Sequence, residues 1–298
     1  MHISEYLKLN TKGHANFDFA DVRLDKDNEL FIDPSLIELG TDSWSRDAKH
    51  IMYSYFDSLY EEFRRGHRNA SPSYLYSHAG EQNATKLGYG NGQNGKGKTA
   101  RGLAMCFEDL AELARVIHTI TRPQDASVLV KGFAEDCMSD LLTNILHESL
   151  NSFTAMQMAK YKIAPDNKKR FSTWSAETKN WIEVIRPCWQ YGNKELLLVP
   201  KWVVRKNFLF SVNQYLSLVI AERIRDEKGW HDMSKKDIIA NLYKKDKHWR
   251  IDNAIEHTMK NPDDLRRYHE CIPRRYLFAG GCMSDEILDN TIYTQAVS

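Results

Sequence analysis

The chain has 298 residues, with 41 Lys and Arg against 40 Asp and Glu, so its formal net charge is +1. A protein that binds polyanions mainly by counterion release carries a clear basic excess. The balanced charge therefore excludes a general polyanion binder and leaves room only for a local basic patch. Hydrophobic residues make up 42% of the chain, which is ordinary globular composition. A chain of this length buries roughly 75% of its unfolded surface, so its core needs neither a disulfide nor a structural metal.

The sequence also bears on location and on zinc binding. No apolar run approaches the ~18 residues that a membrane helix requires, and the N-terminus lacks the basic and apolar regions of a signal peptide. The five cysteines are scattered and contain no C-x-x-C pair. This usage excludes a zinc finger and indicates reduced thiols. We expect a cytoplasmic protein with no zinc site and no membrane partner.

In the first half of the chain, residues 17–33 predict two short strands joined by an Asp- and Asn-rich turn at 25–28. Apolar residues at intervals of three and four predict a helix over 47–65. Residues 66–102 contain eight glycines and are too glycine-rich for a regular element. Loops of this length inside a compact domain are usually functional, so this loop is the first place to look for a site.

The same reasoning predicts a helix at 103–117, a short strand at 128–130 and a long helix at 139–161. The polar run 166–170 is interpreted as a solvated turn, followed by strands at 181–185 and 195–199 around a turn at 191–193. The second of these strands is continuously apolar and is expected to be central. Further helices are predicted at 208–225, 234–245, 251–259 and 263–269. No repeat or linker divides the chain, so residues 1–298 are predicted to form one α+β domain, mostly helical around a small mixed sheet.

The glycine-rich loop contains a formal phosphate-loop match, Gly92-Gln-Asn-Gly-Lys-Gly-Lys98-Thr99. In a true phosphate loop the lysine binds the phosphates and the threonine binds magnesium, and a buried strand precedes the loop. The residues before Gly92 do not form such a strand, so a nucleotide cofactor is not expected. Lys96, Lys98, Thr99 and Arg101 still suit a clamp for phosphate groups, and the alternative is a basic surface loop without function.

A second pattern places Asp136, Asp140, Asn144 and Glu148 four residues apart, so on a helix they form one polar stripe. Two neighbouring carboxylates could hold Mg²⁺ or Mn²⁺, or divide the roles of acid and base. Acids near a helix start also occur simply because they cap the helix and favour its dipole. Both interpretations remain open.

Lys201 follows the apolar run 196–199 and could stabilise charge at a phosphate that is being cleaved, as lysines do in metal-dependent nucleases. Such nucleases place an acid two residues before that lysine, and Val199 occupies this position here. Asp33 ends another apolar run, at a strand end where sites are often built.

Three segments together resemble a family of uncharacterised bacterial proteins associated with mobile and phage-defence gene neighbourhoods. They are Leu30-Phe31-Ile32-Asp33-Pro34, the helix start from Asp136 to Ile145, and the run from Leu197 to Arg205. The resemblance spans roughly residues 20–245. It implies a bacterial cytosolic protein with a role in defence and assigns no activity to any residue.

We therefore predict a bacterial effector that acts on nucleic acid or nucleotides, as a metal-dependent phosphodiesterase or nuclease. Asp33, Asp136 and Asp140 are its candidate metal ligands, and Asp136, Asp140 and Lys201 are its candidate catalytic residues. The alternative is a non-catalytic sensor or interaction subunit of a defence complex, which binds a protein or nucleic acid through the loop 66–102. A phosphate-loop protein that binds nucleoside triphosphates is a third hypothesis.

Overall fold

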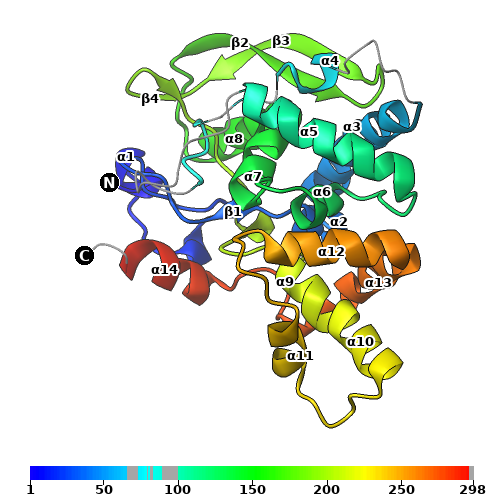
Figure 1. Cartoon of the computed structure of the whole chain (residues 1–298). Coiled ribbons are helices and arrows are strands. Elements are labelled where there is room, and N and C mark those ends of the chain that lie inside the picture. Colours follow the sequence, from blue (N-terminus) through cyan, green and yellow to red (C-terminus); the bar gives the residue numbers. More distant parts are fainter. Residues whose placement is uncertain (66–72, 79, 81–82, 89–99, 295–298) are drawn as a thin grey trace.

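Helices make up most of the structure, and its strands form small sheets (Figure 1). The computed structural model describes residues 1–65, 73–78, 80, 83–88 and 100–294, and for residues 73, 76 and 100–104 it describes only the backbone. Within these residues the strands form three separate two-stranded antiparallel sheets, where we expected one small mixed sheet. The predicted class, a mostly helical α+β protein, is confirmed.

The longest strands form the hairpin of β2 (Asn167–Ser175) and β3 (Asn180–Cys188), which lies at one end of the molecule (Figure 1). The strand predicted at 181–185 is confirmed within β3, whereas the solvated turn predicted at 166–170 is wrong. Residues 167–170 are all exposed, so no hydrophobic alternation marks them as a strand. They become one because they pair in register with residues 185–188.

The other sheets join distant or neighbouring short segments. Strand β1 (Phe31–Ile32) pairs with β6 (Val204–Arg205), and β4 (Gln190–Tyr191) pairs with β5 (Lys194–Glu195). The hairpin predicted within 17–33 is wrong, because β1 takes its partner from residues 204–205 and the rest of the segment makes isolated bridges. The predicted turn is present, since the side chain of Asn28 exchanges hydrogen bonds with the backbone of Arg23.

The apolar run 196–199 is buried but is not a strand, which corrects the prediction of a central strand. Its backbone groups are satisfied one at a time by different parts of the chain. The N–H groups of Leu196, Leu197 and Leu198 donate to Trp189 O, Ala84 O and Thr154 Oγ1, and Val199 O accepts from Ala20 N. Burial explains the apolar composition, and tertiary contacts take the place of a sheet.

Helices in the first part of the chain are α1 (Ile3–Tyr6), α2 (Pro34–Leu39), α3 (Ser43–Arg65), α4 (Ser73–Tyr76), α5 (Ala100–Val116), α6 (Pro123–Leu129), α7 (Glu135–Ile145) and α8 (His147–Lys160). The predictions of α3 and α5 are confirmed. The single long helix predicted at 139–161 is two helices, α7 and α8, which meet at Leu146. The strand predicted at 128–130 is wrong, because Pro123 and a capping box at Asp125 start helix α6 there.

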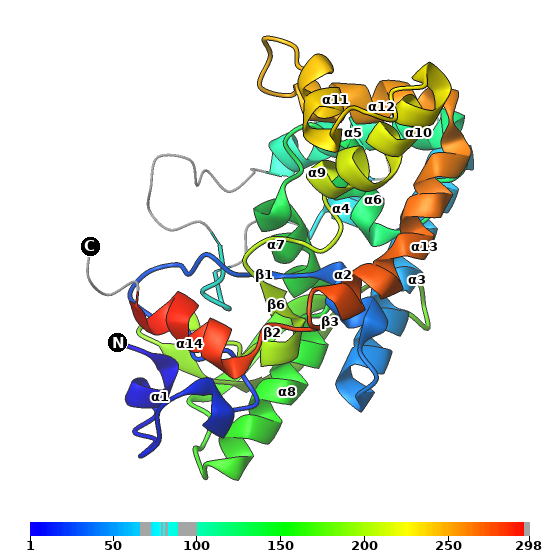
Figure 2. The same ribbon diagram turned by 90° about the horizontal axis from the view of Figure 1, so that it is seen from below.

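From Val212 onward, all regular elements of the described residues are helices. Helix α9 (Val212–Tyr215), a π-helical turn (Leu216–Ile220) and α10 (Ala221–Lys228) run on without a break. They are followed by α11 (Lys235–Asn241), α12 (Trp249–Lys260), α13 (Pro262–Phe278) and α14 (Asp285–Tyr293). Helix α14, which we did not predict, lies beside the N-terminal segment that contains α1 (Figure 2).

A single hydrophobic cluster connects these parts. It contains residues from the N-terminal segment, from helices α3, α5, α7 and α8, and from α13 and α14. Of the helices that the structure describes, none combines the length and the apolar character that a membrane crossing requires.

Candidate functional site

The polar stripe of α7 lies against two described glycines of the glycine-rich loop 66–102. Asn144 Nδ2 donates to Gly80 O at 2.7 Å. Gly88 has a φ of +135°, and a β-carbon there would lie 2.8 Å from Asp136 Oδ1. Only glycine fits this close approach in that backbone conformation. The structure thus brings Asp136 and Asn144, with Asp140 between them on the same helix face, to the base of the loop.

Asp33 has a different environment. Its side chain is fully buried, and its two oxygens accept hydrogen bonds from Ser35 N and Leu209 N, each at 2.8 Å. It is the N-cap of α2. Burial raises the pKa of Asp33 to about 6, and the two backbone hydrogen bonds oppose this rise only in part. These contacts give Asp33 a role in joining α2 to the segment before α9.

Lys201 also has contacts away from α7. Its Nζ donates to His14 O at 2.6 Å and forms an ion pair with Asp285 Oδ1 at 2.6 Å. Asp285 lies in the first turn of α14. Lys201 therefore helps to hold α14 against the N-terminal segment.

The phosphate clamp cannot be compared with the structure in the same way. Lys96, Lys98 and Thr99, and with them the phosphate-loop match at 92–99, lie outside the described residues. Arg101 is in the first turn of α5, where only the backbone is described. Among the described residues no group of three or more His, Cys, Asp or Glu side chains is arranged to hold a metal ion.

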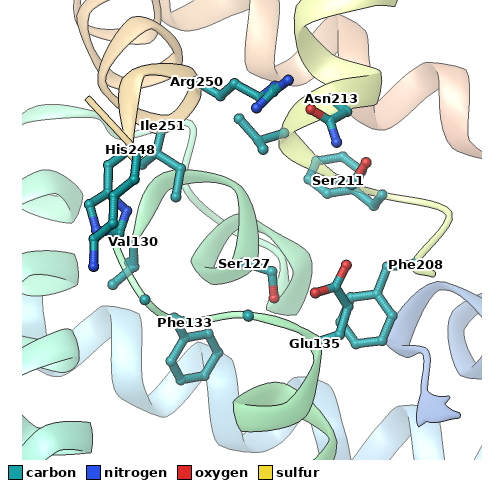
Figure 3. A pocket seen from close by; sticks show the side chains of 15 residues that line it. Ser127, Val130, Phe133, Glu135, Phe208, Ser211, Asn213, His248, Arg250 and Ile251 are labelled. Carbon is teal, nitrogen blue, oxygen red and sulfur yellow. The ribbon is translucent and has the colours of Figure 1, made fainter. Parts of the chain in front are cut away.

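A pocket that we did not predict lies at the N-terminus of α7. It has a volume of about 360 Å³ and is formed where α6, the turn before α7, the segment before α9 and the start of α12 meet (Figure 3). Its apolar wall contains Val130, Phe133, Phe208 and Phe210. The pocket is therefore suited to a ligand with a flat or apolar part.

The lining also includes basic residues, here called the basic wall. Lys247, His248 and Arg250 line the pocket at the start of α12. Within the described chain neither Lys247 nor Arg250 has an ion-pair partner, and the guanidinium of Arg250 lies 4.5 Å from the ring centroid of Trp249. Glu135 is the one acidic residue of the lining, and Figure 3 shows its carboxylate beside Phe208, across the pocket from Arg250. The excess of positive charge favours an anionic ligand.

Two helices begin at this pocket. Ala134, the N-cap of α7, and His248, the N-cap of α12, both line it, and neither N-cap side chain forms a capping hydrogen bond. The N-terminal N–H groups of a helix carry partial positive charge and bind anions such as phosphate. The helix dipoles thus add to the field of Lys247 and Arg250, and the first-turn acids Glu135, Asp136 and Asp252 offset part of this positive field.

Ser127, near the end of α6, completes the lining. Its hydroxyl is shielded from solvent and has no hydrogen-bond partner among the described residues. An unpaired buried hydroxyl costs about 1–3 kcal/mol. A ligand group that bonds to Ser127 would recover this cost, which makes the hydroxyl an independent sign of a polar ligand.

One comparison with known proteins is informative. Residues 8–211 match the model of a domain of unknown function (DUF8370), which covers more than half of the chain. The chain belongs to this family. No curated protein and no solved structure matches it.

The DUF8370 region ends in the middle of the pocket. Ser127, Phe133 and Glu135 belong to this region, whereas Lys247, His248 and Arg250 lie beyond it. The apolar wall therefore comes from the DUF8370 region and the basic wall from the C-terminal helices. The signal for the basic wall is the run Lys244-Lys-Asp-Lys-His-Trp-Arg250, which leads into the first turn of α12.

Proposed function

We propose that this protein binds a phosphate-bearing ligand, a nucleotide unit of the kind found in nucleic acids, in the pocket between α7, α9 and α12. The observation that carries this proposal is that the basic residues and the N-termini of α7 and α12 meet phenylalanine side chains in one pocket. The basic residues and helix N-termini suit a phosphate group, and the phenylalanine side chains suit a base. The carboxylate of Glu135 suits a ribose hydroxyl or a base amine, because it can only accept hydrogen bonds.

Replacing Arg250 by Ala is expected to weaken binding of fluorescently labelled adenosine monophosphate by roughly 10- to 150-fold, because a hydrogen bond to a charged group is lost. Fluorescence anisotropy measures the affinity, and inorganic phosphate serves as a competitor. Arg274→Ala is the control, because Arg274 is exposed on α13 and lies outside the pocket lining. Equal affinities of the wild type and Arg250→Ala would contradict the proposal.

Ser127→Ala separates binding from folding in the same assay. The substitution removes an unpaired buried hydroxyl, so the thermal midpoint should stay the same or rise. The affinity for the nucleotide should fall, because the ligand loses a partner. A variant that is both less stable and unchanged in affinity would show that Ser127 serves the fold alone.

We also propose that the bound ligand is hydrolysed with the help of Mg²⁺ or Mn²⁺ held by Asp136 and Asp140, in a bacterial cytoplasmic effector of phage defence. Asp136 follows Glu135 of the pocket lining directly and lies against Gly88, at the base of the loop that carries Lys96 and Lys98. This proximity supports the assignment of the two carboxylates. The five cysteines form no disulfide in the described chain, in keeping with a reducing compartment.

Asp140→Asn tests hydrolysis against the alternative of a non-catalytic sensor. We expect the variant to lose Mn²⁺ binding in calorimetric titration and Mn²⁺-dependent cleavage of an oligonucleotide, because a neutral amide is a weaker ligand than a carboxylate. Its affinity for adenosine monophosphate without metal should stay within about twofold. Nucleotide binding by a wild type that cleaves nothing in Mg²⁺ or Mn²⁺ would instead favour the sensor.

A further inference from the structure

The basic wall of the pocket continues outward along residues 243–250, here called the basic segment. We propose that the basic segment guides a single strand of nucleic acid into the pocket, so that the natural ligand is a single-stranded polymer and not a free nucleotide. This inference rests on the function proposed above and specifies its ligand.

The positive charges of the basic segment lie close together in the sequence and are exposed to solvent. It contains Lys244, Lys245, Lys247 and Arg250 against the single acid Asp246, in a chain whose charges otherwise nearly cancel. All five of these side chains are exposed. Asp246 Oδ1 accepts from His248 N at 2.6 Å, so this carboxylate is turned to its own backbone. Lys244 has a distant partner, Glu256 at 3.6 Å, and Lys245 has none in the part of the chain that the structure describes.

An exposed aromatic ring lies at the first residue of the basic segment. Tyr243 is 62% exposed. The ring of Tyr243 is held in place on one side, because it packs against Trp249 in a T-shaped arrangement with the ring centroids 5.6 Å apart. Trp249 is buried and in turn lies under the guanidinium of Arg250. The chain thus holds Tyr243 beside the basic residues with much of its ring open to solvent.

These features fit a single strand better than a duplex. Single-strand binders combine a positive track for the backbone with aromatic rings on which bases stack. In a duplex the bases are already stacked and are not available to Tyr243. A pocket of about 360 Å³ is also a space for one small ligand rather than for a double helix. Tyr243 contacts Trp249, which lies in the chain between the pocket-lining residues His248 and Arg250, so the exposed ring is next to the basic wall of the pocket.

The test uses the full chain and a 12-nucleotide oligothymidylate, alone and annealed to its complement, with binding followed by anisotropy in the absence of metal. We expect the single strand to bind more tightly than the duplex. Tyr243→Ala should weaken single-strand binding by roughly 5- to 150-fold, the range for loss of one stacked base. Tyr243→Phe, which keeps the ring, should stay within about twofold of the wild type.

The lysines are tested by their salt dependence. Replacing Lys244 and Lys245 together by Ala should make the slope of log K against log salt shallower by about 1.4, because two phosphate contacts are lost. The matched control is the double variant Arg266→Ala and Arg274→Ala, which removes two exposed charges of α13 outside the pocket lining. It should leave the slope unchanged.

The outcomes distinguish this inference from the function on which it rests. Equal affinity for single strand and duplex, or an unchanged affinity in Tyr243→Ala, overturns the inference. If adenosine monophosphate binds through Arg250 but the oligonucleotide does not, the pocket function stands and the path along the basic segment is wrong. If neither ligand binds, both proposals fail.

Discussion

Asp264→Ala is expected to lower the free energy of unfolding by about 3–5 kcal/mol, the range for removing one partner of a buried ion pair. Asp264 is fully buried at the start of α13. Its carboxylate accepts from Arg223 of α10, from His257 Nε2 of α12 at 2.7 Å and from Arg267 at 3.2 Å. Without Asp264 these donors lose their shared acceptor, and α10, α12 and α13 lose their common link. Urea unfolding at pH 7 measures the change.

The matched control is the neighbouring residue Asp263, whose side chain is 74% exposed and pairs only with Arg266 among the described residues. Asp263→Ala should change the free energy of unfolding by less than about 0.5 kcal/mol, as surface substitutions usually do. Similar losses in the two variants would show that the buried cluster is not a special source of stability.

The contribution of Asp264 should also depend on pH in a defined direction. Burial raises the pKa of Asp264, but the hydrogen bonds from Arg223 and His257 outweigh this effect and leave the pKa below its usual value. A carboxyl with a lowered pKa in the folded state stabilises the fold above its unfolded pKa of about 3.9 and loses this effect as the pH falls. The stability gap between the wild type and Asp264→Ala should therefore narrow below about pH 4. A gap that widens in acid would contradict this assignment.

Asp125→Ala is expected to cost about 2–5 kcal/mol, since the buried His269 and two part-buried backbone N–H groups lose their acceptor, and a buried polar group without a partner costs about 1–3 kcal/mol. Asp125 Oδ2 accepts from Thr121 N and Arg122 N, each at 2.8 Å, at the start of α6. Its Oδ1 lies 2.6 Å from His269 Nε2 of α13. The carboxylate of Asp125 thus caps α6, a helix of the DUF8370 region, and also binds His269 of α13, a helix beyond this region. Asp125 therefore belongs to the contact between the two parts of the chain that form the pocket.

A double-mutant cycle with His269→Ala measures the interaction energy between Asp125 and His269. If the two residues act as a pair, the double variant should lose less stability than the sum of the single variants. Asp42→Ala is the control, because Asp42 also accepts from a backbone N–H, Ser45 N at 2.9 Å, but is partly exposed and has no such partner on a second described helix. It should cost about 1 kcal/mol, the usual value of an N-cap. If the stability losses of Asp125→Ala and His269→Ala simply add in the double variant, the two residues do not act as a pair.

The sequence was most informative where a local pattern is enough. The spacing of buried residues in α3, such as Met52, Phe56 and Phe63, has the period of a helix with one buried face, and no distant residue is needed to form that pattern. Of the predicted polar stripe, Asp136, Asp140 and Asn144 lie on one helix, α7, for the same reason, whereas Glu148 belongs to α8. Even here the sequence could not show that Leu146 ends α7, since a helix break without Gly or Pro has no strong local signal.

Pairing between distant segments was beyond the reach of the sequence. Strand β1 pairs with β6 more than 170 residues later, and residues 167–170 form a strand only because 185–188 lie beside them. The buried run 196–199 has the composition of a strand, yet its backbone bonds to four separate segments. Composition reports that a residue is buried, but not which partner satisfies its backbone.

By itself, then, the sequence determined the mostly helical class, the principal amphipathic helices and the helix that carries Asp136 and Asp140, because these depend on periodicities of a few residues. Only the tertiary structure decided that Asp33 caps a buried helix, that Lys201 pairs with Asp285, and that Lys247 and Arg250 line one pocket together with Phe133 and Glu135. The physical reason is that a binding pocket is made of side chains from segments far apart in the chain, and their meeting depends on the packing of the whole core.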